Sequence, residues 1–142
     1  MTDATAATGI TTYDESLLCV RSLDAGYGDL QILETVDLDV ADGEYVTIVG
    51  PNGAGKSTVM KSVFGLTTYM GGDIEFDGEA IEGRRPEEII FHGIGYVPQS
   101  DNVFPSLSVE ENLEMGAYIL DEVPDDAMQA VYDRFPILEE RQ

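Results

Sequence analysis

The sequence is poor in cysteine, in basic residues and in long apolar runs, and each shortage argues against a class of protein. A single cysteine, Cys19, cannot form an internal disulfide, which fits a reducing compartment. Because Cys19 stands in an apolar stretch, we expect a small buried group and not a nucleophile. No apolar run approaches the ~20 residues that span a bilayer, so a membrane role would come through a partner.

Basic residues are scarce: seven stand against 28 acidic ones, and the formal net charge is -21. This balance argues against nucleic acid as a partner, because the phosphate backbone attracts positive surface. It also strains the compact state by self-repulsion, which salt relieves. Because the acids are spread along the whole chain, we expect a halophilic protein of a very salty cytoplasm. The alternative is an ordinary acidic domain.

The length and the apolar fraction of 43% fit one globular domain. Residues 1–14 are expected to be a flexible tail, because their start is rich in Thr, Ala and Asp and has no signal-peptide pattern. Residues 15–142 are expected to fold.

Hydrophobic patterning predicts an α/β fold with an antiparallel β layer, then a strand, loop and helix, then further helices. We expect turns at residues 26–29, 42–43 and 71–72. Strands are predicted at 17–23, 32–40, 45–49, 73–76 and 94–97. Helices are predicted at 56–66, at 86–90, from the capping box at 108–111 through 120, and from 125 or 126.

Gly50 to Thr58 fit the pattern G-x-x-x-x-G-K-[ST], between a predicted strand and a predicted helix. The glycines let backbone N–H groups surround a phosphate, and the helix start adds positive potential. Lys56 would reach the β- and γ-phosphates of ATP, and the Ser57 hydroxyl would hold Mg²⁺. The alternative is a glycine-rich turn without a ligand. The residues expected to bind ATP are Gly50, Pro51, Asn52, Gly53, Ala54, Gly55, Lys56, Ser57 and Thr58.

From about residue 17 to the C-terminus, the sequence resembles the ATP-binding subunits of ABC transporters. Beyond the loop, the features that carry the resemblance are Tyr27 between two glycines, Asp42-Gly43-Glu44, Tyr96-Val97-Pro98-Gln99 and Leu107-Ser108-Val109-Glu110-Glu111-Asn112-Leu113. The resemblance implies a RecA-like P-loop NTPase core, an antiparallel β subdomain and the start of the helical subdomain.

The resemblance also implies roles for residues outside the loop. Tyr27 would stack on adenine, although it could be a plain turn aromatic. Gln99 would contact Mg²⁺ or the attacking water, and the implied catalytic residues are Lys56 and Gln99; alternatively, Gln99 is a surface amide. The implied partners are a second ATP-binding subunit, head to tail, and transmembrane permease subunits. The protein would then lie in the cytoplasm, peripheral on the inner face of the membrane.

Val103-Phe104-Pro105, which follow Gln99, resemble the LivF-type ATPases of branched-chain amino-acid importers. ATPases for other cargoes share parts of this segment, so the cargo stays open. A non-transport ABC ATPase is a weaker alternative.

The remaining family motifs are absent from the sequence. There is no LSGGQ-type motif, no Walker B strand and no switch histidine, since His92 precedes Gln99 and is expected at a helix end on the surface. Residues 117–122 imitate Walker B, but their helical spacing predicts a helix end. The family hydrolyses ATP, whereas we expect this incomplete chain to be inactive alone; a hydrolysis-dead module or remnant is the alternative. Unpaired strands at 45–49 and 94–97 would also make it marginally stable.

Overall fold

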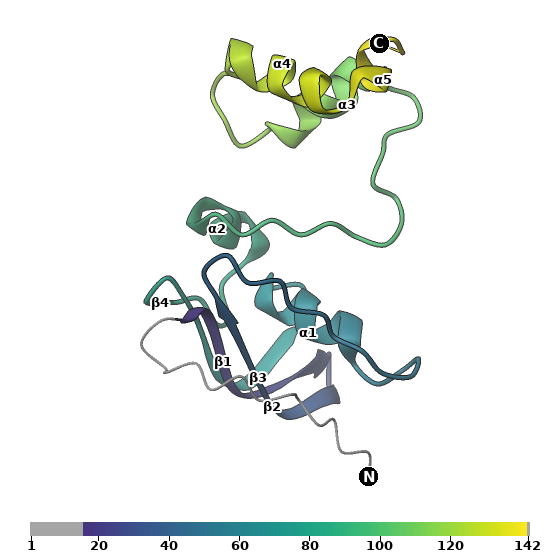
Figure 1. Cartoon of the computed structure of the whole chain (residues 1–142). Helices are drawn as coiled ribbons and strands as arrows, with labels where there is room; N and C mark the ends of the chain where they lie inside the picture. Colours follow the sequence, from purple (N-terminus) through teal and green to yellow (C-terminus); the bar gives the residue numbers. More distant parts are fainter. Residues whose placement is uncertain (1–15, 142) are drawn as a thin grey trace. The chain divides into compact units, whose positions relative to one another are not determined.

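The structure, a computed structural model, describes residues 16–141. The chain divides into two compact units, Met1–Tyr96 and Val97–Gln142, which are described separately. The expected tail at residues 1–14 lies outside the described residues. The elements are β1 (Ser16–Tyr27), β2 (Leu30–Ala41), α1 (Lys56–Val63), β3 (Thr68–Phe76), β4 (Glu79–Ala80), α2 (Pro86–Ile89), the 3₁₀ helix η1 (Ile90–His92), α3 (Val109–Gly116), α4 (Asp125–Arg134) and α5 (Pro136–Glu139) (Figure 1).

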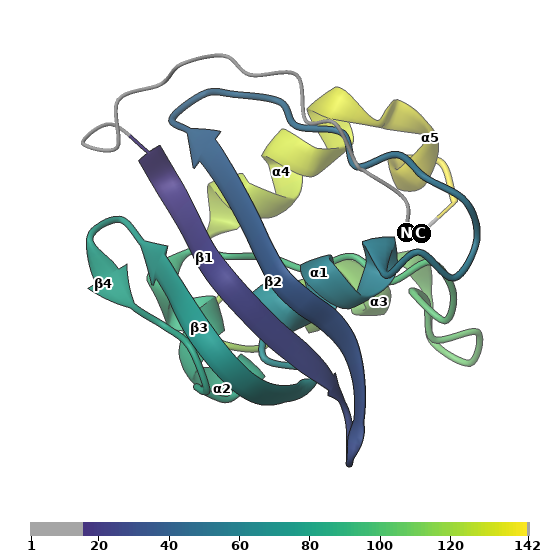
Figure 2. The same ribbon diagram turned by 90° about the horizontal axis from the view of Figure 1, so that it is seen from below.

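The first unit is built on an antiparallel sheet with the strand order β2-β1-β3-β4. Figure 2 shows the four strands in this order, and α1 contacts β1, β2 and β3. The predicted antiparallel layer is thereby confirmed. The buried core between sheet and helix consists of Val20, Leu23, Ala25, Leu33, Val59, Val63, Ile74 and Ile81.

The helix α1 ends at Val63, three residues before the predicted end. Gly65 has a φ of 75°, its N–H donates to the Ser62 carbonyl at 3.1 Å, and the Leu66 N–H donates to the Lys61 carbonyl at 2.8 Å. This pair of bonds is the Schellman arrangement, in which a left-handed glycine ends a helix. A Cβ on Gly65 would lie 2.4 Å from the Arg84 carbonyl oxygen, so the site also excludes a side chain.

The predicted strands at residues 45–49 and 94–97 are wrong: both segments have no regular secondary structure and lie outside the sheet. Tyr45 and Val49 are 93% and 81% exposed. The apolar composition of residues 45–49 favours a strand covered on both faces, but a strand also needs a hydrogen-bonded neighbour. Every strand pair within residues 16–141 is antiparallel, and none includes either segment.

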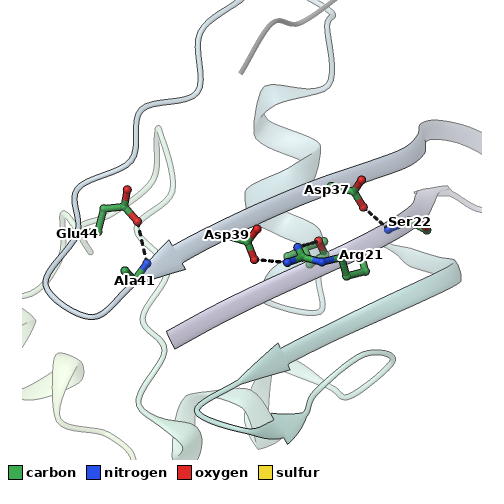
Figure 3. Close-up of polar contacts among 7 residues, drawn as sticks. Arg21, Ser22, Asp37, Asp39, Ala41 and Glu44 are labelled. Carbon is green, nitrogen blue, oxygen red and sulfur yellow. Dashed lines mark hydrogen bonds and ion pairs between the residues drawn. The ribbon is translucent and has the colours of Figure 1, made fainter. Parts of the chain in front are cut away.

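The turn predicted at Gly71-Gly72 is also wrong, because β3 runs through both glycines. Similarly, β1 extends through Tyr27, so the first turn is confined to residues 28 and 29. The turn at Asp42-Gly43 is confirmed. The Glu44 N–H donates to the Ala41 carbonyl at 3.1 Å, and the Ala41 N–H donates to the Glu44 carboxylate at 2.8 Å (Figure 3).

In the second unit, the predicted capping box opens α3. The Ser108 hydroxyl accepts from the Glu111 N–H at 3.1 Å, and the Glu111 carboxylate accepts from the Ser108 N–H at 2.7 Å. The helix ends at Gly116, so Leu120 lies beyond it, and the predicted extension to residue 120 is wrong. Residues 117–122 form turns and bends and no strand, which agrees with a helix end. No helix among residues 16–141 has the length and apolarity needed to cross a bilayer.

Candidate functional site

The loop Gly50–Gly55 leads directly into α1 and has the backbone that the motif predicts. Gly53 and Gly55 have φ values of 82° and 89°, in the left-handed region that glycine adopts at low cost. The Ala54 N–H donates to the Pro51 carbonyl at 3.2 Å, and the Val59 N–H to the Gly55 carbonyl at 3.0 Å, the first bond of the helix. The loop is therefore a tight turn followed at once by a helix N-terminus.

Gly55 is held against the sheet. A Cβ at this position would lie 2.9 Å from Leu33 Cδ2 and 3.7 Å from Ile32 Cγ2, both on β2. Gly53 also has positive φ, but no atom lies within 4 Å of its hypothetical Cβ. Glycine is thus required at position 55 both by the backbone conformation and by the close approach of Leu33. At position 53 it is required by the backbone conformation alone.

The Lys56 ammonium lies across the loop. Its Nζ donates to the carbonyls of Gly50 at 2.8 Å and Pro51 at 2.7 Å. Among residues 16–141, no carboxylate lies within ion-pair distance of Lys56. The charge is therefore neutralised by no partner in the described chain and can be shared with an anionic ligand.

The start of α1 is free of acidic residues, although the chain contains 28 of them. Ser57 is exposed in the first turn, where its hydroxyl is accessible to a ligand. Thr58 is only 7% exposed, and its side chain belongs to the core. If Thr58 contributes to phosphate binding, its backbone amide is the group available.

No group of three or more His, Cys, Asp or Glu side chains in the described part of the chain is arranged to hold a metal ion. Mg²⁺ is commonly bound by one or two protein oxygens together with phosphates and water. The single exposed hydroxyl of Ser57 fits that arrangement, in which the nucleotide supplies the other ligands.

Tyr27 ends β1 in the same unit as the loop and is 44% exposed. The turn beside it is anchored to β3, because the Gly28 N–H donates to Thr68 Oγ1 at 3.0 Å. The aromatic ring is thus available on a fixed turn, and its stacking on adenine stays a prediction.

Gln99 is exposed at a bend in the second unit. Next to it, the Asn102 side chain donates to the Pro98 carbonyl at 2.8 Å. The role of Gln99 toward Mg²⁺ stays a prediction, because the two units are described separately.

Sequence reasoning missed the role of Asn112. Its Oδ1 accepts from the Phe104 N–H at 2.7 Å, and its Nδ2 donates to the carbonyls of Phe104 at 3.1 Å, Leu107 at 3.3 Å and Ser108 at 2.8 Å. One side chain thus fixes the segment between Gln99 and α3. The only signal was its place in the Leu107–Leu113 motif.

His92 ends the short 3₁₀ helix, as predicted, and its side chain is partly buried, with 19% of it exposed. Its ring lies 3.0 Å from Arg84 Nη1 and 3.2 Å from the Glu79 carboxylate. Cys19 is only half-buried and lies outside the core, so the predicted buried position is wrong. Partial burial raises the pKa of its thiol, and the nearby carboxylates of Asp39 and Glu75 raise it further, against the opposing effect of Arg21.

Comparison with known proteins places this site in a family. The sequence profile of the ABC transporter family matches residues 33–142. A probable branched-chain amino acid transport ATP-binding protein, LivF of Archaeoglobus fulgidus, is 46% identical over 123 residues, or 86% of this chain. The high-affinity branched-chain amino acid transport ATP-binding protein BraG of Pseudomonas aeruginosa is 41% identical over 128 residues, or 88%. A ribose import ATP-binding protein of Lactococcus lactis, RbsA, is 38% identical over 100 residues.

The fold agrees with these matches. A solved ATP-binding subunit of an ABC transporter has a TM-score of 0.72 and 31% identity, over 89% of this chain and 52% of that one. The chain spans about half the length of the first two relatives, 52% of LivF and 54% of BraG. With a family profile that covers most of its length and the G-x-x-x-x-G-K-[ST] motif in the loop before α1, the chain belongs to the ABC transporter ATP-binding family.

Proposed function

We propose that the chain binds Mg-ATP through residues Gly50 to Thr58, with Tyr27 on the adenine ring. The observation that carries the proposal is the Lys56 ammonium, which lies across a left-handed glycine loop at an acid-free helix start. Backbone N–H groups, the helix N-terminus and one ammonium are the donors that hold phosphate in P-loop proteins. In a chain of net charge -21, such local donors must overcome long-range repulsion of the nucleotide.

Ser57 would hold the Mg²⁺ that accompanies ATP, and a contact of Gln99 with Mg²⁺ stays a prediction from the family resemblance. The metal would neutralise charge on the phosphates. Lys56 contributes by holding the β- and γ-phosphates, and the exposed Ser57 hydroxyl orients the ion at the first turn of α1.

The larger function we propose is the ATP-binding subunit of an importer, with branched-chain amino acids as the cargo. The 46% and 41% identities to LivF and BraG, both named for that transport, support this cargo. The Val103-Phe104-Pro105 segment points the same way. The partners would be a second ATP-binding subunit and a transmembrane permease, at the inner face of the cell membrane. Since RbsA is named for ribose import, an ABC ATPase for another cargo is the alternative.

We further propose that the 142 residues alone bind nucleotide without hydrolysing it. The sequence contains no LSGGQ-type motif and no Walker B carboxylate, so it lacks a group to activate water. A hydrolysis-dead binding module is the competing function, and it makes the same prediction for this chain.

The test uses the only two lysines, both of which lie on α1. In a fluorescence titration with Mg-ATP carrying a methylanthraniloyl label, Lys56→Ala should weaken binding at least about tenfold, because a charge-assisted contact to phosphate is lost. Lys61→Ala removes the same charge from the other end of the helix and should bind like the wild type.

Equal affinities for the wild type and Lys56→Ala would refute the proposed binding site. Phosphate release should be undetectable for the 142-residue chain. It should appear in a chimera that adds the C-terminal half of the Archaeoglobus relative, and its absence there would favour the hydrolysis-dead alternative.

A further inference from the structure

The pairing of β1 with β2 in the first unit has four register shifts, between Ser16 and Leu18, Val20 and Leu23, Leu23 and Ala25, and Ala25 and Gly26. The second and third of these shifts are two bulges that lie close together. In the first, two residues of β1 oppose one residue of β2; in the second, one residue of β1 opposes two of β2. The second bulge therefore restores the register that the first one shifts. The pairs that bracket the bulges are Val20 with Leu38, Leu23 with Val36, and Ala25 with Leu33.

Each bulge is held by an aspartate of the opposite strand. Ser22 and Thr35 have φ values of 48° and 52°, a region that L-residues other than glycine seldom adopt. The Ser22 N–H donates to Asp37 Oδ1 at 2.7 Å (Figure 3), and the Thr35 N–H donates to Asp24 Oδ1 at 2.7 Å. In both cases the aspartate is the single residue that faces the bulged pair.

The bulges decide which side chains enter the core. In a regular strand, residues three apart point to opposite faces. Yet Val20 and Leu23 are both 0% exposed, and on β2 Leu33 is 3% exposed while Val36 packs against the same core. The extra residue between Val20 and Leu23 on β1 brings both of these side chains to the inner face of the sheet. The extra residue between Leu33 and Val36 does the same on β2.

The second bulge lies next to the residue of β2 that approaches the loop. Thr35 lies two residues after Leu33, whose Cδ2 is 2.9 Å from the place that a Cβ on Gly55 would occupy. The same end of the hairpin carries Tyr27, which pairs with Leu30. The two elements proposed to contact ATP, the loop and the aromatic ring, are thus both supported by the hairpin end beyond Asp24.

We propose that Asp24 is a positioning residue for the nucleotide site, an inference that rests on the proposed function. By accepting from the Thr35 N–H, it holds the left-handed bulge, which seats Leu33 under Gly55 and fixes Tyr27 relative to the loop. Asp24 contacts no nucleotide in this account. Its contribution is the backbone conformation of the β2 residues next to the loop.

The test compares Asp24→Ala with Asp24→Asn by titration with methylanthraniloyl-labelled Mg-ATP. The alanine variant should bind about tenfold more weakly, since the bulge loses its acceptor. The asparagine variant should bind nearly like the wild type, because its Oδ1 can accept the same hydrogen bond. Asp39→Ala is the matched control: that carboxylate lies 2.6 Å from the Arg21 side chain, not from a bulge amide (Figure 3), and its removal should leave affinity unchanged.

A second variant separates positioning from loss of folding. Adding Thr35→Gly to Asp24→Ala supplies a residue that adopts positive φ without an acceptor, so affinity should recover. This double variant carries the test if Asp24→Ala alone does not fold.

The inference is overturned if folded Asp24→Ala binds like the wild type, if Asp24→Asn is as weak as Asp24→Ala, or if the double variant folds without recovering affinity. The proposed function fails separately, when the wild type and Lys56→Ala bind equally. Wild-type binding that depends on Lys56 but not on Asp24 refutes only the positioning role.

Discussion

At the scale of single residues, Gly53 and Gly55 of the loop allow a controlled comparison, because both have positive φ but only Gly55 lies close to Leu33. Alanine at positive φ costs about 1–2 kcal/mol, so Gly53→Ala should lower the free energy of unfolding by about that amount. Gly55→Ala has the same backbone strain and also places a methyl group 2.9 Å from Leu33 Cδ2, so it should be clearly more destabilising. Urea denaturation followed by circular dichroism measures both. Equal losses would show that the Leu33 contact does not constrain the loop.

Residue patterns predicted the loop well and its support poorly. The glycines, Lys56 and Ser57 are adjacent in sequence, and their chemistry is local. The contact between Leu33 and Gly55 joins residues from different elements, and the Asp24–Thr35 bond depends on strand register, so neither follows from a short motif. Asn112 was part of a recognised segment, but its four hydrogen bonds converge only in the folded turn.

At the scale of elements, the α3 capping box gives a quantitative prediction. Ser108→Ala removes the acceptor for the Glu111 N–H and should weaken α3 by about 1 kcal/mol. Amide hydrogen exchange in α3 should therefore become faster, by roughly fivefold. Ser106→Ala is the control, because no side-chain hydrogen bond of Ser106 is seen within residues 16–141, and exchange should not change. Unchanged exchange in Ser108→Ala would contradict the role of the cap.

Elements with local start and stop signals were predicted correctly more often than elements that depend on a partner. The starts of α1 and α3 follow from the loop motif and the capping box, whereas the predicted end of α1 at residue 66 overlooked the stop at Gly65. The segments 45–49 and 94–97 have strand composition but no paired neighbour in the described chain. The strand at 17–23 was predicted, but the inward position of both Val20 and Leu23 was not, because a bulge and not the sequence period aligns these side chains.

At the scale of the whole molecule, the charge of -21 predicts that stability depends on salt. The screening length falls from about 10 Å at 0.1 M to about 3 Å at 1 M, so repulsion among the acidic residues weakens. The thermal midpoint of unfolding should rise steadily as KCl is raised from about 0.1 M to about 2 M. Sucrose at about 0.1 M, added in place of the extra salt, serves as the uncharged control. A midpoint that does not change with KCl would refute the halophilic hypothesis.

The family and the mixed α/β class could be predicted from the sequence, because the loop, the Gln99 segment and the start of α3 follow one another as they do in the resembled family. The separation into two units could not, because no linker composition marks the boundary at Tyr96. The chain spans about half the length of LivF and BraG, so transport has to be tested in a longer protein.

The most direct test of ATP binding at the loop is an amide NMR spectrum of the ¹⁵N-labelled chain in high salt, with Mg-ATP and separately with adenosine. If the loop binds the triphosphate, Mg-ATP should shift the amide resonances of Gly53, Gly55, Lys56 and Ser57, whereas adenosine, which carries no phosphate, should leave them in place. Shifts confined to other parts of the chain, or equal shifts with adenosine, would rule out triphosphate binding at this loop.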